Sequence, residues 1–78
     1  MHKVRFYRLL RGLTQIDLAN KSGVSAGRIH LVETGRAALR PADLEKLSET
    51  LGVRSEGLQG VVGEEYTSIV EKDQTGAA

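Results

Sequence analysis

The side chains able to do chemistry in this 78-residue sequence do not form a set that a catalytic mechanism needs. The two histidines, His2 and His30, have no metal-ligand spacing to each other or to an acidic residue. The sequence has no cysteine and no phosphate-binding glycine loop. No general base accompanies the serines, which are Ser22, Ser25, Ser48, Ser55 and Ser68. We therefore expect no enzyme, no metal site and no cofactor.

Positive charge is the chemistry that the sequence does concentrate. Residues 1–40 contain eight Lys or Arg and two acidic residues, whereas residues 41–78 contain three basic and eight acidic residues. The net charge of +1 for the whole chain conceals this asymmetry. Local positive charge neutralises phosphates and releases their counterions, so the first half suits a nucleic-acid backbone. A solvated charged surface is the simpler alternative.

Two short helices separated by a glycine turn must position those cations. Thr14 is a good helix N-cap, and Leu18 and Ala19 follow it on the inner face of one helix. Gly23 then turns the chain, and Ser25 caps the next helix. This arrangement is a helix-turn-helix, which lays its second helix in the DNA major groove.

The periodicity of apolar residues predicts an all-α chain, with helices over residues 3–11, 15–21, 25–34 and 41–51 and a last short helix capped by Ser55. That last helix is weak because Gly57 and Gly60 disfavour helix. Asp43 and Glu45 fall in the first turn of the fourth helix, where they favour its dipole. The residues expected to point inward are Val4, Tyr7, one of Leu9 or Leu10, Leu18, Ala19, Ile29, Val32, Leu44, Leu47 and Leu51.

Three groups of residues at fixed spacings resemble the Cro/C1-type helix-turn-helix family, also called the XRE family. They are Arg8, Gly12, Leu13, Thr14, Gln15, Leu18, Ala19, Gly23, Val24 and Ser25; Ile29, Glu33, Gly35 and Arg36; and Pro41, Leu44, Leu47, Leu51, Gly52 and Val53. The resemblance implies a compact five-helix, lambda-repressor-like domain over residues 1–60, followed by a tail over residues 61–78. It also implies that residues 25–34 form the recognition helix.

The resemblance further implies which residues contact DNA. Gln15 would lie beside a phosphate, where its amide can also brace a side chain of the recognition helix. Arg28 would flank the base-reading positions toward the backbone, or pair with guanine if it turns inward. For the cations, a merely solvated charge is the alternative to a phosphate contact. The full set expected at the DNA is Thr14, Gln15, Ser25, Ala26, Gly27, Arg28, His30, Leu31, Arg36 and Arg40.

The positions that face base edges depart from the family's usual residues. Ala26 and Gly27 offer no side-chain hydrogen bonds, although Gly27 can let the helix approach the bases closely. Ala26 and Leu31 can touch thymine methyl groups, and His30 can reach guanine or a phosphate. The alternative is that Leu31 is a buried or interface residue and that base readout is poor.

Arg8 and Glu33 occupy positions that can pair across the first and third helices in the family's pattern. A half-buried bridge between them would fix the orientation of the recognition helix. Removing one partner would strand a charge, at a cost of about 3–5 kcal/mol if the pair is buried. Both residues are therefore expected to have a structural role.

The C-terminal residues are expected to form a homodimer surface, because dimers of such domains read half-sites about 34 Å apart. The apolar candidates are Leu58, Val61, Val62, Tyr66, Ile69 and Val70. Ile16 and one of Leu9 or Leu10 are extra apolar residues that can receive the tail or a second subunit. The tail suits a strand by composition and a helix by spacing, so its structure stays open. Residues 73–78 are expected to be disordered.

Together these features predict a small transcription regulator, a repressor that binds double-stranded DNA sequence-specifically. One alternative is an antitoxin that binds DNA and captures a partner protein through its tail. Another is a protein-interaction module that has lost DNA binding. No apolar run approaches the ~20 residues that a membrane span needs, and nothing resembles a signal peptide. We therefore expect a cytoplasmic protein without a membrane partner.

Overall fold

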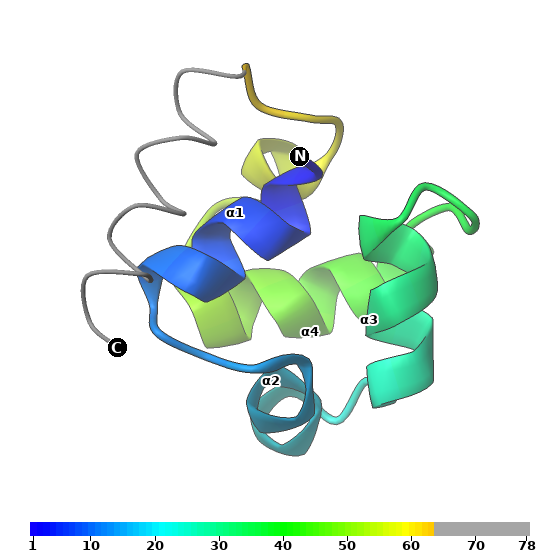
Figure 1. The fold of residues 1–78 in the computed structure, drawn as a ribbon. Helices are drawn as coiled ribbons and strands as arrows, with labels where there is room; N and C mark the ends of the chain where they lie inside the picture. The colour runs from blue at the N-terminus through cyan, green and yellow to red at the C-terminus, as the bar shows by residue number, and fades with distance from the viewer. Residues whose placement is uncertain (64–78) are drawn as a thin grey trace.

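Over residues 1–63, the part of the chain that the structure describes, the protein folds as four α-helices and one 3-10 helix (Figure 1). The structure is a computed structural model. In chain order the elements are α1 (Lys3–Leu10), α2 (Gln15–Ser22), α3 (Ala26–Glu33), α4 (Pro41–Leu51) and the 3-10 helix η1 (Ser55–Leu58). The all-α prediction is confirmed, and the four predicted α-helices end within one residue of these bounds.

Local capping sets the boundaries of α2 and α3. The Thr14 hydroxyl accepts a hydrogen bond from the Asp17 N–H at 3.0 Å, and the Asp17 carboxylate accepts one from the Thr14 N–H at 3.0 Å. This reciprocal capping box satisfies two N–H groups that the helix itself leaves free. Gly23 ends α2 with a φ of 81°, which a residue without Cβ adopts at little cost. Ser25 then caps α3 by accepting from the Arg28 N–H at 3.1 Å.

The beginning of the chain lies against the segment that follows η1 (Figure 1). His2 and Val61 form an isolated antiparallel bridge. Two backbone hydrogen bonds flank this bridge. The Lys3 N–H donates to the Gly60 carbonyl at 3.0 Å, and the Val62 N–H donates to the Met1 carbonyl at 2.9 Å. Val61 nevertheless keeps 68% of its surface exposed. The bridge therefore holds the backbone of Val61 and leaves its side chain in solvent.

Among residues 1–63, eight apolar side chains are buried and form the core: Val4, Leu18, Val24, Ile29, Val32, Leu47, Leu51 and Leu58. Tyr7, Ala19 and Leu44, also expected inside, pack against this core while half-buried. Leu10 is 45% exposed, and Leu9 is half-buried without joining the core. The prediction that one of these two leucines points inward is therefore wrong, because Val4 and Tyr7 already cover the inner face of α1.

The last predicted helix is a single 3-10 turn, and its leucine belongs to the core. Arg54 precedes this turn at the cap position, so Ser55 is its first residue and not its cap. Gly57 within the turn and Gly60 beyond it disfavour a regular α-helix. Leu58 has 0% of its surface exposed. The prediction that Leu58 contributes to a dimer surface is wrong, because that side chain closes the core of the monomer.

Three of the other tail candidates, Tyr66, Ile69 and Val70, lie outside the described residues. The prediction of a strand, a helix or disorder in the tail beyond Gly63 also concerns residues outside that part of the chain. Within residues 1–63, no helix is long and apolar enough to cross a lipid bilayer. The same residues contain no group of three His, Cys, Asp or Glu side chains placed to hold a metal ion.

Candidate nucleic-acid interface

α3 has one face in the core and the opposite face in solvent. Ile29 and Val32 are completely or almost completely buried, whereas Gly27, His30 and Leu31 are exposed. Leu31 has 39% of its surface exposed, so it is not a core residue. A helix that is open along one side in this way can enter a groove of another molecule.

The exposed face of α3 carries few side chains that can form hydrogen bonds. Nothing lies within 4 Å of the Cβ that an added side chain would place at Gly27. The packing of the protein therefore does not require a glycine there. The Thr34 hydroxyl at the end of the helix uses its proton to donate to the His30 carbonyl at 2.9 Å. His30 is thus left as the polar side chain of this face, beside the apolar Leu31.

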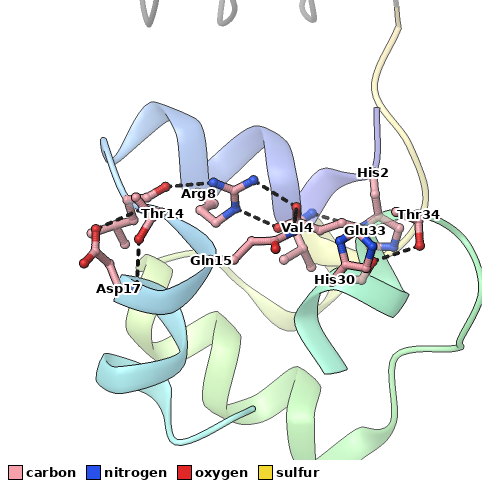
Figure 2. A network of polar contacts seen from close by, with 10 residues as sticks. His2, Val4, Arg8, Thr14, Gln15, Asp17, His30, Glu33 and Thr34 are labelled. Carbon is pink, nitrogen blue, oxygen red and sulfur yellow. Dashed lines mark hydrogen bonds and ion pairs between the residues drawn. The ribbon is translucent and has the colours of Figure 1, made fainter. Parts of the chain in front are cut away.

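A buried ion pair joins α1 to α3 (Figure 2). Arg8 donates from Nε to Glu33 Oε2 at 2.8 Å and from Nη2 to Glu33 Oε1 at 2.9 Å. Its Nη1 donates to the Leu13 carbonyl at 2.8 Å. The two side chains are 9% and 2% exposed, so both charges are removed from water together. Paired, nearly parallel bonds of this kind are the strong form of an Arg–carboxylate interaction.

Gln15, the first residue of α2, joins the same carboxylate. Its Nε2 donates to Glu33 Oε1 at 3.1 Å (Figure 2). Side chains from α1, α2 and α3 therefore meet at Glu33, and this contact adds a polar link between the two helices of the helix-turn-helix. An amide nitrogen carries two N–H groups, so one donor of Gln15 remains for a ligand at the surface.

A second cluster holds the α3–α4 loop against the start of α3. Arg28 donates from Nε to Asp43 Oδ2 at 3.3 Å and from Nη2 to the Ala38 carbonyl at 2.6 Å. Arg40 donates from Nε to the same Asp43 oxygen at 3.0 Å. The Asp43 side chain is 9% exposed, against 22% for Arg28 and 63% for Arg40. One buried carboxylate thus serves two cations.

The pKa of Asp43 reports this balance. Burial by itself raises the pKa, but the hydrogen bonds and positive charges of Arg40 and Arg28 outweigh burial and hold the pKa below the ordinary value. Asp43 therefore stays ionised, as the two arginines require.

The helix-turn-helix family matches this chain over residues 4–58, from the first turn of α1 to the end of η1. The chain belongs to the Cro/C1-type helix-turn-helix family. The HTH-type transcriptional repressor RghR of Bacillus subtilis (strain 168) is 40% identical to it over 62 residues, which are 78% of this chain and 46% of the relative. The chain thus spans about half the length of that relative. No solved structure matches the chain.

In this helix-turn-helix domain the polar residues expected at DNA differ in how far their side chains are already used within the protein. The hydroxyls of Thr14 and Ser25 accept hydrogen bonds as helix caps, which leaves their O–H donors, and both residues are exposed at the N-termini of α2 and α3. Arg36 is exposed just after α3, and Arg40 is exposed before α4. Arg40 also bonds Asp43 but stays mostly exposed, whereas Arg28 makes two bonds within the protein and is mostly buried.

Two polar roles were missed in the sequence. Asp43 was interpreted as a dipole partner, whereas it is the buried acceptor for Arg28 and Arg40; the i, i+3 spacing of Arg40 and Asp43 is the signal that could have revealed half of this cluster. His2 caps α1, because its Nδ1 accepts a hydrogen bond from the Val4 N–H at 3.0 Å (Figure 2). Histidine is an unusual cap, and no local pattern marked it.

Proposed function

We propose that this protein binds double-stranded DNA sequence-specifically, with α3 in the major groove, and represses transcription. The observation that carries the proposal is the open face of α3, held at a defined angle by the buried contact of Arg8, Gln15 and Glu33. The family match and the similarity to the transcriptional repressor RghR support a repressor. The comparisons give no support to the antitoxin alternative.

In this proposal base reading is mainly by shape and apolar contact. Ala26 and Leu31 touch thymine methyl groups, and His30 donates to or accepts from a base edge. Gly27 lets the helix backbone come close to the bases. Thr14, Gln15 and Ser25 lie at helix N-termini, where backbone N–H groups and the helix dipole favour a phosphate. Arg36 and Arg40 supply the longer phosphate contacts, which position the protein without reading sequence.

Fluorescence anisotropy tests this function. The purified protein is titrated against a duplex taken from upstream of its own gene and against a random duplex, at two salt concentrations. Sequence-specific binding predicts a preference of about 1,000-fold or more for the upstream duplex. Steep salt dependence without a preference would reduce the function to backbone binding. Absence of binding to either duplex would favour a protein-interaction module.

Two variants separate the two kinds of contact. L31A is expected to weaken binding to the preferred duplex and to leave binding to random DNA unchanged. R36A is expected to weaken both and to reduce the slope of log affinity against log salt by about 1. K46A, an exposed change on α4, is the matched control for loss of one positive charge. Equal effects of L31A and K46A would remove α3 from the interface.

We also infer that the protein acts as a homodimer through its C-terminal residues. Val61 supports this, because its apolar side chain is 68% exposed although its backbone is held in place. Val62, Tyr66 and Ile69 complete the proposed surface. Sedimentation at high micromolar concentration should give the mass of a dimer, and V61E should give that of a monomer. A monomeric mass for the unmodified protein would overturn the dimer.

A further inference from the structure

Arg28 is positioned on the recognition helix but directed away from it. It is the third residue of α3, in the part of a recognition helix that ordinarily meets the DNA. Its Nε and Nη2 are used within the protein, by Asp43 at 3.3 Å and by the Ala38 carbonyl at 2.6 Å. The side chain is 22% exposed. In this state Arg28 cannot present a full guanidinium edge to a guanine or a phosphate.

Asp43 is the group that holds this arrangement. Its carboxylate is nine-tenths buried at the start of α4 and accepts from both Arg28 and Arg40. Two cations share one anion, so the cluster carries a single net positive charge where two free arginines would carry two. Cations that reach phosphates strengthen binding to every DNA sequence alike. Removing cations from that task therefore lowers binding to every DNA sequence alike and makes that binding less dependent on salt.

We propose that Asp43 is a positioning residue that limits how many cations of this domain contact DNA phosphates. It retains Arg28, and in part Arg40, on the protein and so leaves recognition to the His30 and Leu31 face of α3. This inference rests on the proposed function, because it concerns how strongly the DNA-binding domain holds the DNA backbone. It assigns the role to a residue that touches no base and no phosphate.

The test compares D43N with E45Q. Both substitutions remove one negative charge from the first half of α4, but Glu45 is exposed and forms no ion pair with an arginine in residues 1–63. Each protein is titrated with the preferred duplex and with a random duplex at several salt concentrations. D43N should bind random DNA about eightfold more tightly at 0.1 M salt for each cation that it frees, and its salt slope should steepen by about 0.9 per cation. The affinity for the specific duplex should rise by the same factor, so the preference should stay near the wild-type value, while E45Q should keep the wild-type slope and affinities.

Arg28 variants establish whether Asp43 acts through that side chain. In an R28Q background, D43N should change the salt slope only by the amount that comes from releasing Arg40. R28Q alone should keep the wild-type salt slope, because an arginine held on the protein makes no phosphate contact. This second measurement decides the matter even if D43N does not fold, which circular dichroism reports.

The outcomes separate the two proposals. A folded D43N protein with the wild-type salt slope and the wild-type affinity for random DNA would overturn the role of Asp43 and leave the proposed function intact. An R28Q slope reduced by about 0.9 would do the same, because Arg28 would then already contact a phosphate. A wild-type protein that binds neither duplex would refute the proposed function and this inference together.

Discussion

Replacing Glu33 by glutamine tests whether the buried pair holds α3 against α1. Three hydrogen bonds reach the Glu33 carboxylate, two from Arg8 at 2.8 and 2.9 Å and one from Gln15 at 3.1 Å. E33Q keeps the shape of the side chain but leaves the Arg8 charge, in a residue 8% exposed, without its counter-ion. Breaking a buried pair in this way costs about 3–5 kcal/mol. At roughly 0.05–0.15 kcal/mol per residue, a domain of about 63 residues has only about 3–9 kcal/mol to lose.

Urea and thermal unfolding followed by circular dichroism at neutral pH measure this loss. Since each kcal/mol lowers the Tm of so small a domain by about 4–8 °C, the E33Q protein should melt at least ~12 °C below wild type. E49Q, an exposed change on α4, should stay within about 0.5 kcal/mol of wild type. A double variant, R8M with E33M, should lose less than E33Q, because it leaves no stranded charge. An E33Q protein within about 1 kcal/mol of wild type would refute the reasoning.

Three further variants probe the recognition helix and the helix caps. G27A should raise the free energy of unfolding by up to about 1 kcal/mol and weaken DNA binding, as measured by urea unfolding and anisotropy; unchanged affinity would contradict close approach at Gly27. T14A should lower the free energy of unfolding by about 1 kcal/mol because the capping box with Asp17 is lost. Burial lowers the pKa of His2 from 6.5, so neutral His2 stabilises the fold at higher pH and its contribution is lost as the pH falls from about 6.5 through the lowered pKa. H2N keeps a cap acceptor for the Val4 N–H and should flatten the stability profile between about pH 7 and 5.

Local features account for the parts that sequence analysis predicted correctly. Thr14, Gly23, Ser25 and Pro41 act through neighbours a few residues away, by capping, by a left-handed backbone or by a fixed φ. Short stretches of the sequence are therefore enough to predict the helices. The pairing of Arg8 with Glu33 was expected from the family's pattern, because no local rule connects residues 25 positions apart.

Long-range packing decided the rest. Leu58 was expected on a dimer surface, but the return of η1 to the core buries it completely. Arg28 was expected near DNA, but the loop after α3 brings Ala38 and Asp43 within reach of its guanidinium. The sequence by itself determined where the helices begin and end, because capping and turn residues act on near neighbours. It also determined that the first half of the chain is basic, because that is a property of composition. Only the tertiary structure decided which charges are free to meet a ligand, because a charge is neutralised by whatever the fold places beside it.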